Sequence, residues 1–540
     1  MLWAAGAHAA PATFDWFEYT GHDAVFETPV PPGHYRNPIL AGFYPDPSIT
    51  RAGDTFYLVN STFAYFPGIP VFASRDLVHW QQLGNVIDRG AQLSFDGLGV
   101  SRGVFAPDIA FHDGTFYVLN TAVDSGGNFF VTAKNPAGPW SDPVWLKDLD
   151  GIDPSLFFDN DGKAYVLNNG PPEGTPRYPG HRAIWIQEID FAKGQLVGPR
   201  RVLVNGGVEL AKQPIWIEGP HLYRRNGWYY LMCAEGGTGP GHSEVVFRAR
   251  SPWGPFVPYA GNPILTQRDL AADRANPITN AGHADLIEAP DGSWWAIFLA
   301  SRAYGGTHYN TGRETFLLPV TWRDEWPVIL PKGEAIPYVA RGPANVSRAN
   351  QTPTTGNFTW RDEFDKPTLD PAWLYVRVPR DAWADLRTTP GALTIHPRDE
   401  PLDTLENPSF LARRQQHTSF TASTAYRLPP AGHIAAGLVA FQNENFWYFF
   451  GARRLTNGMQ LFLDRRDGHA TTTIATAVLP ADAPLELKIE AHAAAYSFSY
   501  ASAGHGWQTL RANEDGTLLS TDVAGGFVGA MVGVYARSEQ

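Results

Sequence analysis

The sequence predicts an all-β protein in which a five-bladed β-propeller is followed by a β-sandwich. Three observations lead to this prediction. Aromatic residues make up 13% of the chain and charged residues 18%, while 53 glycines and 45 prolines interrupt many short apolar runs. One acid-containing hairpin pattern occurs five times, and strands of alternating pattern recur without it in the last third of the chain. This mixture is typical of all-β architecture, and no helical periodicity of convincing length accompanies it.

The repeated unit consists of an acidic residue, a short apolar strand, a turn that contains glycine, and a strand of aromatic and β-branched residues. In the first unit Asp46 precedes a strand around Ile49, and Gly53 lies in the turn before the strand Thr55–Val59, which is a hairpin signal. The acids that open the five units lie 45 to 67 residues apart: Asp46, Asp108, Asp153, Glu218 and Asp285. A repeat of this length is typical of propeller blades, whose first strands line a central channel. We therefore expect the five acids to point toward one axis.

These patterns divide the chain into four parts. Residues 1–36 are expected to form an irregular lead-in, and residues 37–335 the five-bladed propeller. Residues 336–358 are rich in Pro, Gly, Asn, Ser and Thr and are expected to be a linker. Residues 359–540 contain regularly spaced alternating strands such as Leu485–Glu490, which favours a two-sheet sandwich.

Charge and composition exclude several classes of partner. The formal net charge of −12 is spread along the 540 residues without basic clusters, so nucleic acid is not an expected partner. No apolar run of 18 residues occurs, so no membrane span is expected. The single cysteine, Cys233, cannot form an internal disulfide and is expected to be a buried apolar residue. The sequence does not decide whether the protein forms a homo-oligomer.

The beginning of the chain suggests export. Ala7-His8-Ala9 has the small-x-small form of a signal-peptidase site, although the charged and long apolar parts of a signal are missing. A periplasmic or secreted protein is therefore favoured, with a cytoplasmic one as the alternative.

The repeated acids are the candidates for chemistry. Two carboxyl groups across a small pocket are the minimum for acid–base hydrolysis of a glycosidic bond, and a third carboxylate can raise the pKa of the acid. Asp46 and Asp153 both occur in an Asp-Pro-Ser context, and Glu218 is the only one of the five with a longer side chain. For any single acid the alternative is a structural role, because carboxylates at strand starts often cap turns.

The motifs around these acids carry a resemblance to a known family. The chain resembles glycoside hydrolase family 43, specifically the β-xylosidase/α-L-arabinofuranosidase group with an added C-terminal jelly-roll, concanavalin-like sandwich. The resemblance covers nearly the whole chain from Asn37. Its carriers are Tyr44-Pro45-Asp46-Pro47-Ser48, Gly103–Asp108, Ile152-Asp153-Pro154-Ser155, Ile217–His221, Glu235–Gly239, Gly282–Asp285 and Gly312–Thr315.

The resemblance implies an inverting, exo-acting hydrolase. Asp46 matches the general base, Glu218 the general acid, and Asp153 the carboxylate that tunes and orients the acid. Inversion requires the base and acid carboxyls to lie roughly 6.5–9.5 Å apart, with room for water. Arg313 matches an arginine that binds the hydroxyls of the sugar and lies near Asp153.

Further residues match the sugar pocket and the propeller axis. Phe63 and Phe105 match aromatic walls, and Phe105 stands where members often have Trp. Phe527 resembles a residue of the sandwich that reaches across the pocket. For all three, ordinary core packing is the alternative. His283 is similar to an axial histidine that in several members reaches a Ca²⁺ ion; calcium prefers oxygen ligands, so a hydrogen-bonded core histidine is the alternative there. No organic cofactor is implied.

Three functional hypotheses remain at this point. The first is release of xylose from xylo-oligosaccharides, and the second is release of α-L-arabinofuranosyl groups from arabinoxylan. Phe105 and the loop 238–242 favour a substantial arabinofuranosidase activity without deciding between the two sugars. The third hypothesis is a non-catalytic carbohydrate-binding propeller with a lectin-like sandwich, and the three matched carboxylates with Arg313 argue against it.

Overall fold

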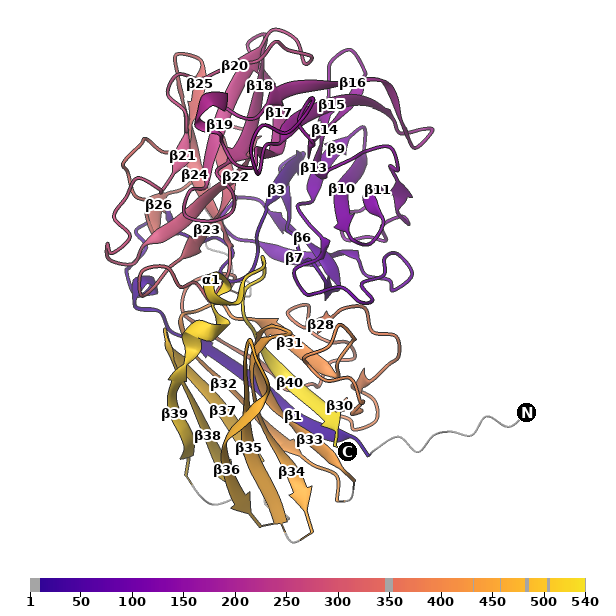
Figure 1. The fold of residues 1–540 in the computed structure, drawn as a ribbon, viewed down its shortest axis with the longest axis vertical. Coiled ribbons are helices and arrows are strands. Elements are labelled where there is room, and N and C mark those ends of the chain that lie inside the picture. The colour runs from indigo at the N-terminus through magenta and orange to yellow at the C-terminus, as the bar shows by residue number, and fades with distance from the viewer. Residues whose placement is uncertain are drawn as a thin grey trace, which may run out of the picture.

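A computed structural model describes residues 10–344, 353–430, 432–456, 458–480, 485–502 and 506–539. Five small antiparallel sheets form a ring above a two-layer sandwich (Figure 1). The predicted all-β fold, a five-bladed propeller followed by a sandwich, is confirmed. The helices of the described residues are all short: η1 (Ala24–Phe26), η2 (Leu210–Lys212), η3 (Gly516–Leu519) and α1 (Thr521–Ala524). The segment Ala7–Ala9, on which the export prediction rests, lies outside the described residues.

Each predicted hairpin forms the two inner strands of one blade. In the first blade Ser48 pairs with Val59 and Ala52 with Thr55, so the turn lies where the glycine signal placed it. The blades comprise, in order, β3 (Ser48–Ala52), β4 (Thr55–Val59), β6 (Gly68–Ser74) and β7 (Gln81–Ile87); β8 (Gly103–Val104), β9 (Asp108–His112), β10 (Thr115–Val123), β11 (Gly127–Ala133) and β12 (Val144–Trp145); β13 (Ile152–Phe158), β14 (Ala164–Gly170), β15 (Ala183–Asp190) and β16 (Gln195–Asn205); β17 (Glu218–Arg225), β18 (Trp228–Glu235), β19 (Ser243–Ala249), β20 (Val257–Pro258) and β21 (Leu265–Thr266); and β22 (Ile278–Glu288), β23 (Trp294–Arg302), β24 (Glu314–Arg323) and β25 (Trp326–Val328).

The ring closes by contacts between its two ends. β2 (His34–Arg36) pairs with β26 (Val339–Arg341), so the predicted linker 336–358 contains a short strand that belongs to this closure. The side-chain amide of Asn37 donates to the carbonyl of Leu317 at 2.9 Å, and its oxygen accepts from the Leu317 N–H at 3.0 Å. These bonds hold the first blade against the fifth.

The sandwich consists of two sheets whose inner faces share one apolar core. The first sheet has the order β29 (Ala384–Asp385), β30 (Leu393–Ile395), β1 (Ala12–Gly21), β32 (Ser419–Arg427), β37 (Leu485–His492), β38 (Ala495–Ser502) and β39 (Gln508–Asp515), with β27 (Phe358–Asp362) also beside β1. The second has the order β36 (Thr472–Leu479), β35 (Gly458–Asp467), β34 (Phe446–Leu455), β33 (Ile434–Asn443), β40 (Met531–Ser538), β31 (Phe410–Arg414), β28 (Leu374–Val376) and β5 (Tyr65–Phe66).

The structure corrects the prediction of an irregular lead-in, because among its described residues Ala12–Gly21 forms the strand β1. β1 lies inside the sandwich, as the indigo strand among orange and yellow ones in Figure 1 shows, and it pairs with β32 about 400 residues later. Phe14, Phe17 and Tyr19 on this strand are fully buried in the sandwich core. A bulge between Phe14 and Trp16 breaks the simple alternation. The strand was missed because its partners lie at the other end of the chain.

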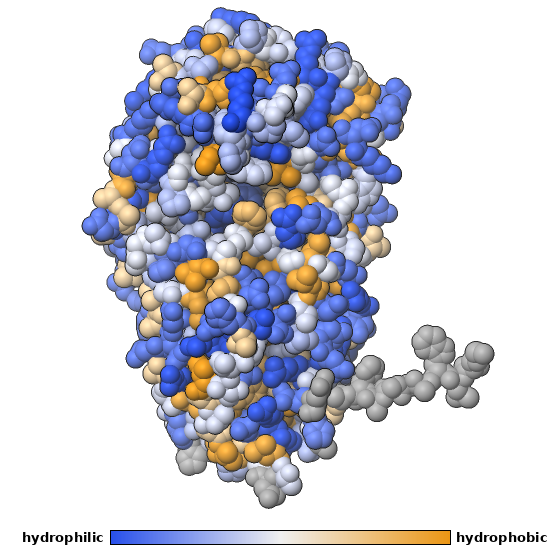
Figure 2. Space-filling model, in the orientation of Figure 1, coloured by the Kyte–Doolittle hydropathy of each residue, from blue (hydrophilic) through white to orange (hydrophobic). Residues whose placement is uncertain are grey.

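The visible face of the molecule mixes hydrophobic and hydrophilic side chains. On the face shown in Figure 2 the hydrophobic residues are scattered among hydrophilic ones. Cys233 is buried and free, as expected. None of the helices of the described residues is long and apolar enough to cross a membrane.

Candidate active site

A cavity of about 410 Å³ lies where the inner strands of the blades begin, and its lining includes the eight residues that the family resemblance nominated. The three candidate catalytic carboxylates and Arg313 line it together with His283, and Phe63, Phe105 and Phe527 form its aromatic walls. Further lining residues are Arg102, Ala106, Val123, Ile152, Trp216, Gly237 and Thr238. The structure therefore brings the sequence candidates from all five blades and the sandwich into one site.

Irregular backbone aims several of these side chains into the cavity. The ladders of the inner strands contain bulges at Asp153, just after Glu218, and at His283. Bulges are frequent next to active sites, where they redirect side chains. Five lining residues other than glycine also have φ angles in the left-handed region, which is uncommon: Asp46 (50°), Phe63 (51°), Asp153 (54°), Trp216 (50°) and His283 (54°).

The five repeated acids occupy two levels of the channel, which corrects the expectation of one ring. Asp46, Asp153 and Glu218 line the cavity, whereas Asp108 and Asp285 lie below it, bonded to the hydroxyl of Ser48 at 3.2 and 2.9 Å. The reason is strand alternation. Asp108 and Asp285 each lie two residues after the position that lines the cavity, and such residues share a face but are one step further along the strand. At the cavity level the second and fifth blades contribute Ala106 and His283 instead of acids.

Asp46 is held by two donors. The hydroxyl of Ser61 donates to its Oδ2 at 2.5 Å, and Nη1 of Arg313 forms an ion pair with its Oδ1 at 2.7 Å. Arg313 lines the same cavity as Asp153, near which it was expected, and the closure of the ring places it next to the first blade, where it pairs with Asp46. The backbone N–H of Tyr44 accordingly donates to the Arg313 carbonyl at 3.1 Å. Asp46 is thereby fixed in one orientation.

Glu218 is buried among charges that oppose its ionisation. Burial, followed by the negative charge of Asp153, raises its pKa to about 8, although the positive charge of His283 acts in the other direction. At neutral pH the carboxyl is therefore protonated, as a general acid requires. Asp153 accepts the Gly219 N–H at 3.2 Å, which ties it to the residue after Glu218.

His283 is the histidine that lies among the three carboxyl groups of the cavity. Its Nε2 lies 3.8 Å from Oδ2 of Asp153. Burial disfavours the imidazolium, but the interaction with Asp153 and the charge of Asp46 outweigh it and raise the pKa of His283 to about 9. Its Nδ1 is buried without a partner among the described residues.

The aromatic walls connect the propeller to the sandwich. The rings of Phe63 and Phe527 stack at 5.9 Å, and Phe105 meets both edge-on at 5.1 and 5.7 Å. The Phe527 N–H donates to the hydroxyl of Ser101 at 2.9 Å, and its carbonyl accepts from Arg313 at 3.3 Å. Phe63 also belongs to an apolar cluster that continues into the sandwich. The sandwich therefore forms one wall of the cavity.

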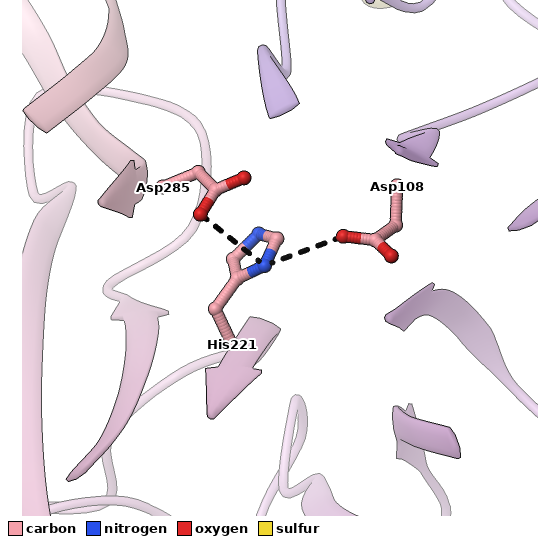
Figure 3. A group of neighbouring side chains, drawn as sticks. All are labelled: Asp108, His221 and Asp285. Atoms are coloured by element: carbon pink, nitrogen blue, oxygen red, sulfur yellow. Dashed lines mark ion pairs between the residues drawn. The ribbon is translucent and has the colours of Figure 1, made fainter. Parts of the chain in front are cut away.

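A second cluster lies on the axis below the cavity (Figure 3). The imidazole of His221 is placed between two carboxylates, with Nδ1 3.5 Å from Asp108 and 3.7 Å from Asp285. Among the described residues this is the group in which three side chains of metal-ligand type come within 4.8 Å of one another, and His283 is not part of it. We call Asp108, His221 and Asp285 the axial cluster.

Sequence reasoning missed several residues of the site. Ser61 and Trp216 had no motif that marked them. His221 was recognised only as part of the motif around Glu218 and was given no role. The bulge between these two residues turns both toward the axis. A regular strand would have placed residues three apart on opposite faces. The aromatic character of Trp216 next to the acid was the one signal that could have found it.

Comparisons with known proteins agree with this geometry. The family model "Glycosyl hydrolases family 43" matches residues 35–327, and the model "Beta xylosidase C-terminal Concanavalin A-like domain" matches residues 361–540. The chain is 40% identical to a xylosidase/arabinosidase of Butyrivibrio fibrisolvens, over 93% of this chain and 96% of the relative. It is 38% identical to a non-reducing end alpha-L-arabinofuranosidase of Bacteroides ovatus, over 93% and 91% of the two chains.

A solved structure agrees as well. The crystal structure of a GH43_12 protein retrieved from capybara gut metagenome superposes with a TM-score of 0.92 at 39% identity, over 98% of this chain and 100% of that one. The family models match both domains in the order that the fold shows. The chain therefore belongs to glycosyl hydrolases family 43 and is a glycoside hydrolase with a C-terminal concanavalin-like domain.

Proposed function

We propose that the protein is an inverting exo-glycosidase that removes terminal β-D-xylosyl or α-L-arabinofuranosyl residues from xylo-oligosaccharides and arabinoxylan. The observation that carries the proposal is the pair of carboxyl groups in different environments. Glu218 is buried beside Asp153, which raises its pKa, whereas Asp46 is paired with Arg313. Glu218 protonates the departing oxygen, and Asp46 takes a proton from the attacking water. Asp153 helps to keep the acid protonated through its own negative charge.

The shape of the site supports exo action. The sandwich contributes Phe527 to one side of the cavity, where it stacks on Phe63 and is bonded to the propeller through Ser101. A cavity of about 410 Å³ with such walls has room for a terminal sugar. A continuous chain would need a groove that is open at both ends.

The two sugars in this proposal are chosen from the names of similar proteins. The names of the Butyrivibrio and Bacteroides relatives cover both xylosidase and arabinofuranosidase activity. D-xylopyranose and L-arabinofuranose can present similar hydroxyl positions, so one pocket can accept both.

Two measurements test the proposal. Initial rates on an aryl β-D-xylopyranoside and an aryl α-L-arabinofuranoside assign the sugar, and comparable rates mean a bifunctional pocket. NMR of the first product formed from each substrate shows whether the anomeric configuration is inverted. Turnover of neither substrate contradicts the sugar assignment, and a first product of unchanged configuration contradicts the roles of Asp46 and Glu218.

The raised pKa of Glu218 predicts a basic limit to activity. Because the acid must carry a proton, kcat/KM on an oligosaccharide should be retained below pH 8 and fall as the pH rises through about 8. A pH profile of kcat/KM measures this directly. A profile that stays flat to pH 9 would show that Glu218 is not the ionising acid.

We also propose that a divalent cation such as Ca²⁺ occupies the axial cluster. Burial, together with the charge of Asp285, raises the pKa of Asp108 to about 8, so the cluster opposes a second negative charge, and a bound cation would offset that opposition. Carboxylate oxygens are ligands that calcium prefers. His283 is not part of this cluster, although its buried Nδ1 has no partner among the described residues.

Metal analysis and chelation test the axial ion. We expect a chelator to lower the unfolding temperature of the wild type and added Ca²⁺ to restore it, whereas His221→Ala should respond to neither. His283→Ala should keep the response. An unfolding temperature that is the same with chelator and with Ca²⁺ would contradict this proposal.

A further inference from the structure

The geometry points to Trp216 as the platform on which the leaving group of the substrate rests, so that this residue determines specificity on the aglycone side. The inference rests on the proposed glycosidase function and extends it beyond the terminal sugar. Trp216 lines the same cavity as Glu218 and Asp153. It is 38% exposed, whereas Glu218 is 7% exposed.

The order of residues before and in β17 indicates where Trp216 lies relative to the catalytic acid. His221 lies in the axial cluster, Glu218 in the cavity, and Trp216 two residues earlier in the sequence. His221 and Glu218 are buried, at 8% and 7% exposed, whereas Trp216 is 38% exposed, so Trp216 is the one of the three that reaches solvent. The departing oxygen must lie at Glu218, because this residue protonates it. The sugar attached to that oxygen must then extend outward past the acid, toward Trp216.

The indole is held in place by the protein. The guanidinium of Arg182 lies 4.9 Å from the centre of the ring, and its Nε donates to Asn169 at 2.6 Å. The backbone N–H of Trp216 donates to the carbonyl of Gly180 at 2.9 Å. A cation over an aromatic face is attractive and fixes the ring against one side. The segment before β15 thus supports the indole.

The backbone of Trp216 has a positive φ, as several other residues of the site do. Its φ of 50° matches those of Asp46, Asp153 and His283, and for a bulky side chain this conformation is an outlier. Such conformations cluster where a site requires a particular side-chain direction. A ring that only filled space could adopt an ordinary backbone, whereas Trp216 lines the cavity and is also 38% exposed. Flat aromatic faces suit the apolar face of a sugar ring.

The test separates the leaving-group side from the terminal sugar. Trp216→Ala is compared with the wild type on two substrates of the same terminal sugar, an oligosaccharide and a glycosyl fluoride. The fluoride has no ring beyond the scissile bond. We expect kcat/KM on the oligosaccharide to fall about tenfold or more, which corresponds to the loss of one stacking contact. The rate on the fluoride should change less than about twofold, and inhibition by the free monosaccharide should be unchanged.

Two control variants complete the test. Trp216→Phe keeps a flat ring and should retain most of the activity on the oligosaccharide. Ile215→Ala removes the neighbouring side chain, which is 48% exposed and does not line the cavity, and should resemble the wild type on both substrates. Equal losses on oligosaccharide and fluoride, or no loss on either, would overturn the role of Trp216 while leaving the proposed function intact. Absence of any turnover by the wild type would overturn both.

Discussion

Replacing Glu218 by Gln is expected to lower kcat/KM on oligosaccharides by about 10²–10⁴-fold, the usual contribution of a general acid. Gln keeps the size of the side chain but has no proton to give. The loss should be much smaller on aryl glycosides with acidic phenols, because such a leaving group departs without protonation. The basic limb of the pH profile near 8 should disappear as well. Initial rates on a series of aryl glycosides of increasing phenol acidity measure the effect.

Two variants serve as controls for this prediction. Asp46→Asn removes the base, so its loss should be similar for good and poor leaving groups, since water attacks in both cases. Glu188→Gln alters a carboxylate of the outer strand β15, which pairs with Lys163 at 2.7 Å, and should leave the rates unchanged. A loss for Glu218→Gln that is equal on all leaving groups would rule this residue out as the acid.

The largest effect on stability is expected at Arg302. Its Nε and Nη2 donate to Glu314 at 2.7 and 2.9 Å, its Nη1 donates to Asp23 at 2.5 Å, and Nη2 also donates to the Gln416 carbonyl at 2.7 Å. The three charged side chains are at most 3% exposed. Asp23 also accepts from Thr418 and from the Ser419 N–H, both at 2.8 Å. This network joins the start of the chain, the fifth blade and the sandwich.

Arg302→Met should lower the free energy of unfolding by about 3–5 kcal/mol, because two buried carboxylates lose their counter-charge. Urea unfolding, followed by tryptophan fluorescence, measures the change. Arg89→Met is the matched control: Arg89 pairs with Asp142 at 2.7 Å, but the two side chains are 40% and 83% exposed. Its expected cost is about 0–1 kcal/mol. A cost for Arg302→Met no greater than that of Arg89→Met would show that the network does not stabilise the fold.

The sequence by itself determined those features that depend on neighbouring residues. The hairpin of each blade follows from local alternation and from turns such as the one at Gly53. Because the five hairpins repeat, their number predicted the number of blades. The motifs around Asp46, Asp153 and Glu218 also sufficed to nominate the carboxylates that the structure brings into one cavity.

Only the tertiary structure decided what depends on residues far apart in the chain. The partners of β1 lie about 400 residues away, so its buried face could not be assigned from local pattern. Strand alternation divides the five acids between two levels, and the bulge between Glu218 and His221 turns both residues toward one axis. Ring closure pairs Arg313 with Asp46. The pKa of Glu218 depends on burial and on the charge of Asp153 in another blade, and these are set only when the blades and the sandwich pack together.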